Sequence, residues 1–243
     1  MKLQEYAVWD RTTRLFHWIN VLCIVMLIAL GTAILNDSAL GIADPGKILL
    51  KTLHVYVGYV FALNLLWRIV WGFIGGPYAR WRAILPFGQG YGTELRTEVA
   101  AWTRSEPANY IGHTPLGRIA ITVILLVLMA QGATGLILAG TDVYMPPLGT
   151  YFADRVKADG LTSGQVKPYA PATVNADAYK QMRAFRGPVV ETHEILFWVI
   201  LGLIGLHIVA VVMTELRHGG SIVSAMITGR KAFHRPPRDT RLP

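Results

Sequence analysis

One stretch near the carboxyl end decides the fold: ETHEILFWVILGLIGLHIVAVVM, residues 191–213. From Ile195 to Met213 every residue except His207 is apolar. A helix of about 20 apolar residues crosses the hydrocarbon core of a bilayer. The stretch therefore predicts a transmembrane helix that has one histidine within it and a second, His193, at its entrance.

These two histidines share one face of the predicted helix. Fourteen residues separate His193 from His207, and because this is close to four turns, the imidazoles lie about 21 Å apart along one stripe. An ionisable side chain inside a membrane span is costly and usually has a function. A single histidine on an apolar helix is nevertheless more often a hydrogen-bonded interior residue than a ligand. The decision depends on whether other helices offer partners at matching depths.

The composition favours a membrane protein. Of the 243 residues, 53% are hydrophobic and 16% are charged, whereas soluble domains carry about 25% charged residues. The formal net charge is +8, and the cationic residues lie outside the long apolar runs. This distribution indicates membrane topology and no nucleic-acid partner. The single cysteine, Cys23, excludes an intrachain disulfide, an iron–sulfur cluster and thioether attachment of a c-type haem.

Three further apolar runs are long enough to span a bilayer. Together they predict an all-α membrane protein, a four-transmembrane-helix bundle that forms a single integral-membrane domain over residues 1–243. We read the first run as a retained span, because it is long for a signal peptide. Short surface helices are expected near residues 92–102 and 221–227. The predicted spans are residues 15–35, 53–74, 117–138 and 194–213, and the longest connection is 140–188.

The distribution of cationic residues predicts the orientation of the chain. Four spans place both termini on one side, and the segments on that side hold 15 of the 23 lysines and arginines. Connections rich in Lys and Arg remain in the cytoplasm. We therefore expect both termini in the cytoplasm and the connection 140–188 on the outer face.

With this orientation, four histidines fall at two depths. His17 begins the first span, near the cytoplasmic face, and His207 lies toward the cytoplasmic end of the fourth. His54 begins the second span and His193 the fourth, both near the outer face. The depths match His54 with His193, here called the outer pair, and His17 with His207, the inner pair. This match favours two bis-histidine sites.

A flat porphyrin suits these pairs better than zinc does. Zinc prefers four tetrahedral ligands, whereas the iron of a haem needs two axial ligands, which helices of a bundle can supply. Gly58, Gly202 and Gly205 either leave room for the macrocycle or serve close helix packing. Two axial histidines leave no open position on the iron, so each haem should pass electrons and the two together should carry them between the membrane faces.

Several segments of the chain resemble those of a known protein family. They are WDRTTRLFHW (9–18), LH (53–54), IGHTP (111–115) and IVSAMITG (222–229), together with His193 and His207. In these segments the chain resembles the bacterial four-helix di-haem cytochrome b family, which includes the b-type cytochrome subunits of nickel–iron hydrogenases, stand-alone cytochromes b and, more distantly, bacterial cytochrome b-561. The resemblance implies that His17, His54, His193 and His207 bind two molecules of haem (heme) b in the bacterial inner membrane.

The resemblance also implies partners. It predicts electron transfer between membrane quinone and a periplasmic partner, either a c-type cytochrome or a hydrogenase-like complex. The segment 140–187 does not look like its counterpart in hydrogenase subunits, which favours the former as much as the latter. The basic residues Lys180, Arg183 and Arg186 either steer an acidic partner or form a solvated face. A homodimer is compatible with this reading.

Other residues near the inner pair are weaker predictions. Among the cytoplasmic-side arginines, Arg14 and Arg118 are the first choices to bind haem propionates. His113 either caps the third span or hydrogen-bonds a propionate or quinone. No catalytic residue is predicted, and an electron-transfer subunit is favoured over a stand-alone enzyme. The alternatives are a superoxide- or small-oxidant-linked quinone oxidoreductase of the cytochrome b-561 type and a bundle without haem.

Overall fold

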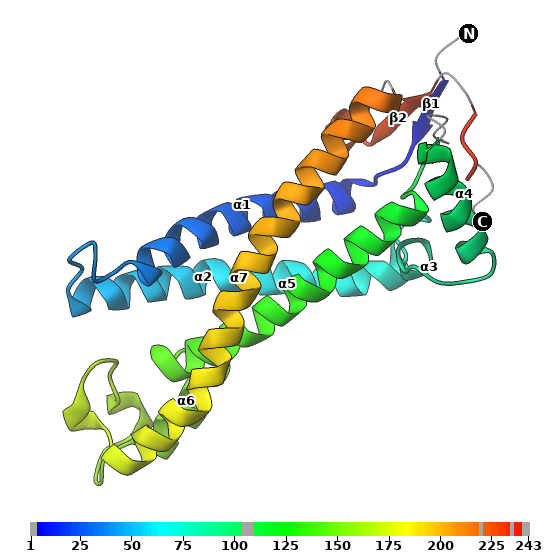
Figure 1. Ribbon diagram of the computed structural model, residues 1–243. Helices are drawn as coiled ribbons and strands as arrows, with labels where there is room; N and C mark the ends of the chain where they lie inside the picture. Colours follow the sequence, from blue (N-terminus) through cyan, green and yellow to red (C-terminus); the bar gives the residue numbers. More distant parts are fainter. Residues whose placement is uncertain (1–3, 104–108, 219–220, 234–235, 240–243) are drawn as a thin grey trace. The chain divides into compact units, whose positions relative to one another are not determined.

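The computed structural model describes residues 4–103, 109–218, 221–233 and 236–239. Four long helices dominate this part of the chain and are long and apolar enough to cross a membrane (Figure 1). The prediction of an all-α membrane protein with four spanning helices is therefore confirmed. These helices are α1 (Arg11–Leu35), α2 (Asp44–Ile74), α5 (Pro115–Asp142) and α7 (Ala176–His218).

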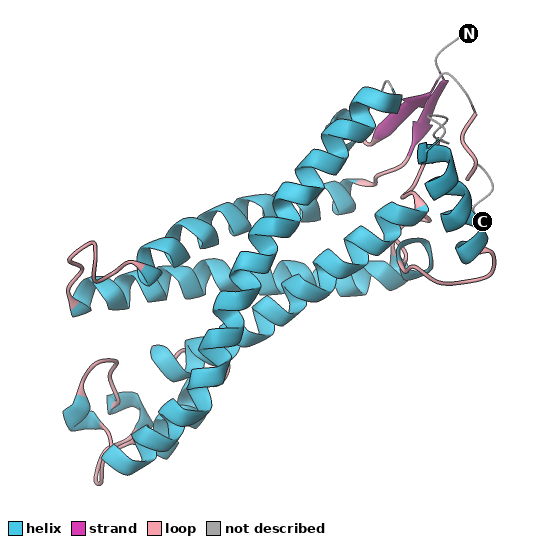
Figure 2. Ribbon diagram, in the orientation of Figure 1, coloured by secondary structure: helices cyan, strands magenta, loops and turns pink. Residues whose placement is uncertain are grey.

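Shorter elements occupy the connections and the chain ends (Figure 2). The helices α4 and α8 confirm the two predicted surface helices, whereas the two short strands were not predicted. The elements are β1 (Gln4–Ala7), α3 (Trp81–Ile84), α4 (Tyr91–Thr103), α6 (Gly149–Val156), the 3-10 turns η1 (Ser163–Gln165) and η2 (Pro171–Thr173), α8 (Ile222–Thr228) and β2 (Arg230–Phe233).

The long helices extend beyond the apolar runs. Helix α7 begins at Ala176, well before the predicted start at residue 194, because hydropathy marks only the part of a helix that is suited to lipid. The Asn175 side chain accepts a hydrogen bond from the Ala178 N–H at 3.0 Å and caps this new start. Asp177 in the first turn suits the positive end of the helix dipole. The outer connection is correspondingly shorter than the predicted 140–188.

The chain divides into two compact units. Unit 1 contains Met1–Ile19, Asn64–Val127 and Ile200–Pro243, and unit 2 contains Asn20–Leu63 and Leu128–Val199. Each of the four long helices contributes a part to each unit. Unit 1 therefore holds the inner pair of histidines, and unit 2 holds the outer pair.

Unit 1 joins the two ends of the chain. Strands β1 and β2 pair antiparallel, with Gln4 opposite Phe233 (Figure 1). The Asp239 carboxylate accepts hydrogen bonds from the N–H groups of Ile111 (2.6 Å) and Gly112 (2.8 Å). The carboxyl-terminal tail thereby holds the connection that precedes α5.

Unit 2 has its own hydrophobic core in the outer connection. Burying these side chains stabilises the segment by roughly 1.5–3 kcal/mol for each large apolar residue. Because Met182 belongs to α7, the core also explains why this helix continues past the apolar run. The core residues are Phe152, Ala153, Val156, Val166 and Met182.

Candidate functional site

Unit 2 brings the two histidines of the outer pair together. His54 comes from α2 and His193 from α7; their ring centroids are 6.3 Å apart and their planes are inclined by 69°. Imidazoles that bind one metal from opposite sides have ring centres about 6 Å apart, since a metal–nitrogen bond is about 2 Å and the ring centre lies about 1 Å beyond. The observed separation suits a single metal atom between them.

Two side chains of α5 hold the His193 ring. Thr134 Oγ1 lies 2.8 Å from Nδ1, and Gln131 Nε2 lies 3.1 Å from Nε2. The Thr134 hydroxyl is within donating distance of the backbone carbonyl of Ala130, which leaves its lone pairs to accept from Nδ1–H. Nε2 is then the unprotonated nitrogen, and the Gln131 amide occupies the position that a metal would take. From the sequence alone, Gln131 and Thr134 are only polar residues within a predicted span.

Glycines leave space beside both rings of the outer pair. A Cβ built on Gly31 would lie 3.5 Å from Cε1 of His54, and one built on Gly135 would lie 3.3 Å from Cε1 of His193. Larger side chains there would fill the space next to the imidazoles. An added Cβ at Gly58, Gly202 or Gly205, the glycines singled out by sequence, meets nothing within 4 Å.

Unit 1 contains the inner pair. His17 of α1 and His207 of α7 both lie in this unit. His17 Nδ1 is buried and has no hydrogen-bond partner among the described residues, and the Trp18 ring lies edge-on to the imidazole at 5.2 Å. The His207 side chain is exposed. This pair also offers an imidazole nitrogen that the protein itself does not use.

The donor sets fit haem better than a metal held by protein alone. Within the described ranges, no three His, Cys, Asp or Glu side chains gather in a group that could hold a metal ion. Each site instead offers two imidazoles, the axial set of a b-type haem iron. His54 Nδ1 is also buried and without a partner in the described part of the chain.

A family model described as prokaryotic cytochrome b561 matches residues 8–229. The chain belongs to this family. It is therefore a multi-pass membrane protein, a b-type cytochrome of electron transport. The match includes all four paired histidines, from His17 to His207.

Curated relatives bear a common description, probable Ni/Fe-hydrogenase B-type cytochrome subunit. The protein from Rhizobium leguminosarum bv. viciae is 27% identical over 238 residues, covering 95% of this chain and 90% of the relative. That from Azotobacter vinelandii is 27% identical, with coverage of 93% and 88%. The hydrogenase 1 subunit of Escherichia coli K12 is 29% identical over 142 residues, covering 54% and 59%. No solved structure matches the chain significantly.

The arginines predicted to bind propionates make backbone contacts in this cytochrome. Arg14 NH1 donates to the carbonyl of Ile227 in α8. Arg118 NH2 donates to the carbonyls of Leu85 and Phe87, the latter at 3.0 Å. The Nε atom of each arginine is buried and has no acceptor among the described residues. Both side chains therefore join segments of unit 1 and retain an unused donor.

Arg68 of α2 is more deeply buried than either. Its side chain, in a residue only 4% exposed, lies over the rings of Phe16 (5.9 Å) and Trp81 (5.3 Å). Its NH2 group donates to the carbonyl of Ala79 at 3.0 Å, whereas NH1 has no partner in the described chain. The guanidinium thus lies over the ring of Phe16, the residue that precedes His17 in α1.

His113 does not cap α5. Thr114 does so, since its Oγ1 accepts a hydrogen bond from the Gly117 N–H at 3.0 Å. His113 instead packs on Trp9, with ring centroids 4.7 Å apart, and its Nδ1 is buried without a described partner. Burial lowers the pKa of His113 to about 3, so the ring is neutral at physiological pH. Nearby cations lower it further: Lys231, Arg68, Arg118 and His207.

Proposed function

We propose that this cytochrome conducts electrons across the membrane through two bis-histidine b haems. His54 and His193 would hold the outer haem, and His17 and His207 the inner one. The close approach of the His54 and His193 rings, with centroids 6.3 Å apart, is the observation that carries the proposal. Two axial histidines leave the iron no open position, so each haem would transfer electrons instead of binding oxygen or substrate.

One helix links the two haems in this proposal. Helix α7 is continuous from Ala176 to His218 and supplies a ligand to each site. Fourteen residues of the sequence separate these two proposed ligands. The chain would thus act as one integral-membrane domain with a redox centre near each face.

The positive-inside distribution supports a cytoplasmic location for both termini, and hence a periplasmic outer connection in the bacterial inner membrane. The electron partner would dock there, and a hydrogenase-like complex is favoured over a c-type cytochrome because of the relatives' descriptions. Of the three residues expected to steer it, Arg186 is instead bound to Asp142. Lys180 and Arg183 remain exposed.

On the inner side, unused donors support binding of an anionic or carbonyl oxygen. We assign propionate binding at the inner haem to Arg14 and Arg118 through Nε, and to Arg68 through NH1. His113, which is neutral at physiological pH and whose buried Nδ1 has no partner in the described chain, can hydrogen-bond a propionate or a quinone carbonyl. Membrane quinone is therefore proposed as the diffusible redox partner on this side.

Haem counting in single-histidine variants tests the proposal. Purified protein should contain two haems per chain, with sharp α-bands on reduction. His54→Ala and His193→Ala should each remove the same haem and leave the other. A colourless preparation, or loss of both haems from a folded His193→Ala protein, would refute the assignment. Superoxide-dependent quinone reduction without any partner would favour the small-oxidant alternative.

A further inference from the structure

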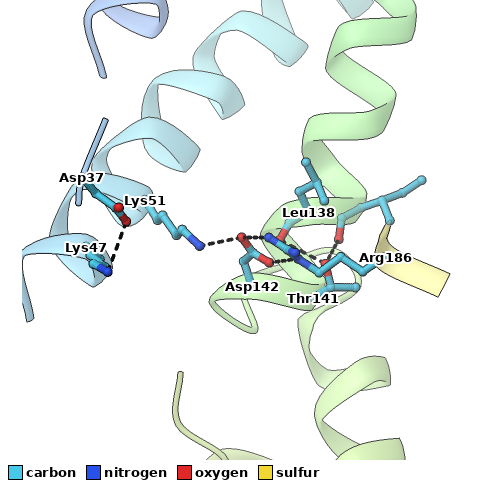
Figure 3. A network of polar contacts seen from close by, with 8 residues as sticks. Asp37, Lys47, Lys51, Leu138, Thr141, Asp142 and Arg186 are labelled. Carbon is cyan, nitrogen blue, oxygen red and sulfur yellow. Dashed lines mark hydrogen bonds and ion pairs between the residues drawn. The ribbon is translucent and has the colours of Figure 1, made fainter. Parts of the chain in front are cut away.

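Unit 2 contains a cluster of three charged side chains from three long helices (Figure 3). Asp142, the last residue of α5, accepts a hydrogen bond from Lys51 of α2, with Nζ 2.9 Å from Oδ2. It also binds Arg186 of α7 through both oxygens, with NH2 2.8 Å from Oδ2. The side chains are only 13%, 18% and 14% exposed for Asp142, Lys51 and Arg186. Charge-assisted, bidentate pairs of this kind between arginine and carboxylate are strong and directional.

The residues of the Asp142 cluster (Lys51, Asp142 and Arg186) lie one or two helical turns from the outer pair or from the glycine beside it. Lys51 precedes His54 by three residues and Arg186 precedes His193 by seven, so each cation shares a helix face with a histidine, one and two turns away. On α5, Asp142 follows Gly135 by seven residues, and Gly135 is the glycine that faces the His193 ring. The cluster therefore joins the same helix faces that form the outer site.

We propose that Asp142 is a positioning residue for the outer haem. By binding Lys51 and Arg186 together, its carboxylate fixes α2 and α7 against α5 so that His54 and His193 oppose one another. Its negative charge also offsets the two cations and so lowers the reduction potential of that haem. This inference rests on the proposed function, since it needs haem at the outer pair.

Partial burial makes the cluster more than a surface ion pair. Exposed pairs contribute little to stability, whereas removing one partner of a buried pair leaves an uncompensated charge and is costly. Here the loss of one carboxylate would leave two cations. Lys51 Nζ also lies 5.3 Å from the centre of the Tyr169 ring, which belongs to the outer connection. That ring shields the ammonium from water, so the charge acts over a longer range.

A neighbouring ion pair serves as a matched control. Lys47, one turn before Lys51 on α2, binds Asp37 at 3.4 Å (Figure 3), and both side chains are more exposed, at 24% and 22%. Asp37 lies in the turn after α1, where its carboxylate binds Lys47 and accepts a hydrogen bond from the Ser38 hydroxyl. Asp37→Asn thus removes the same charge from the same unit without touching the join between the ligand helices.

The test is a redox titration of the holoprotein, followed by haem absorbance and by the low-spin electron paramagnetic resonance signals. The outer component is identified as the one absent from His54→Ala. In Asp142→Asn, the reduction potential of this component alone should rise by about 59 mV. For a one-electron couple, this is about a tenfold increase in the ratio of reduced to oxidised haem at a fixed potential. Its resonance signal should change as the ligand planes move.

Conservative variants separate charge from geometry. Asp142→Glu should retain the wild-type potential more closely than Asp142→Asn, and Asp37→Asn should leave both components unchanged. If Asp142→Asn does not fold, Arg186→Lys, which keeps the charge but loses the two-pronged pair, should alter the outer resonance signal alone. Wild-type potentials and signals in Asp142→Asn, or equal changes at both haems, would overturn the inference. A wild-type protein without two haem components would instead overturn the proposed function itself.

Discussion

Thr134 Oγ1 lies 2.8 Å from Nδ1 of His193. The contact joins α5, which supplies no histidine to either pair, to a proposed haem ligand on α7. Because the hydroxyl is placed to accept from Nδ1–H, it favours the tautomer in which Nε2, here in contact with the Gln131 amide, is unprotonated. Support of this kind governs how firmly a histidine holds its metal.

Replacing Thr134 by Val removes this acceptor while keeping the side-chain volume. Loss of such a partner commonly weakens metal binding by about 10–100-fold, so we expect the outer haem to dissociate more readily and the inner haem to remain. Haem retention during dilution in detergent measures this. Thr141→Val on the same helix is the control, because that hydroxyl donates to the Ile137 carbonyl. Equal retention in both variants would argue against a role for Thr134.

Gly135 provides a steric test of the same site. An alanine methyl group there would lie 3.3 Å from Cε1 of His193, tighter than ordinary contact, and would crowd the ring. Gly135→Ala should therefore lower outer haem occupancy, although Gly→Ala within a helix normally stabilises by roughly 0.5–1 kcal/mol.

Gly58→Ala supplies the comparison, since nothing lies within 4 Å of the added methyl group at Gly58. Absorbance per chain should match wild type in Gly58→Ala, and its thermal stability should rise slightly. A fully occupied outer site in Gly135→Ala would show that the ring has room to move.

The features that could be predicted from the sequence are those that depend on short, continuous stretches of residues. Long apolar runs specify α1, α2, α5 and α7 because burial in lipid requires them, and turn residues with amphipathic patterns locate α4 and α8. The depth of each histidine follows from its place in a run, so the sequence could suggest which of them meet. The structure brings the His54 and His193 rings to 6.3 Å from one another, inclined by 69°, while iron binding stays a prediction.

What the sequence could not supply depends on contacts between distant segments. Strands β1 and β2 have four residues each and lie at opposite ends of the chain, so no local signal links them. Gly31 and Gly135 resemble any other glycine in a span until the facing ring is known. Asp142 reads as the polar end of a helix, and only the packing of α2 and α7 reveals its two cations.

Acid should destabilise unit 1 through His113. Its pKa is about 3 in the folded protein and about 6.5 when unfolded, so between these values the unfolded chain binds more protons. Stability therefore falls as pH drops from about 6.5 toward 3, by at most about 1.4 kcal/mol per pH unit. Unfolding in detergent at several pH values measures the slope. His113→Gln should flatten it, and an unchanged slope would assign acid sensitivity to other groups.

Arg68 should tune the inner haem. Its guanidinium is buried beside Phe16 with NH1 unpaired in the described chain. If it binds a propionate of the inner haem as proposed, Arg68→Gln removes a positive charge that favours the reduced iron. The reduction potential of the inner component should fall by about 59 mV, which is about a tenfold decrease in the ratio of reduced to oxidised haem at a fixed potential. Arg230→Gln is the control, because its ion pair with Glu5 is 67% and 58% exposed and solvent screens it. An equal shift in both variants would reduce the effect to net charge, whereas a shift confined to Arg68→Gln would support a local effect of this guanidinium on the inner haem.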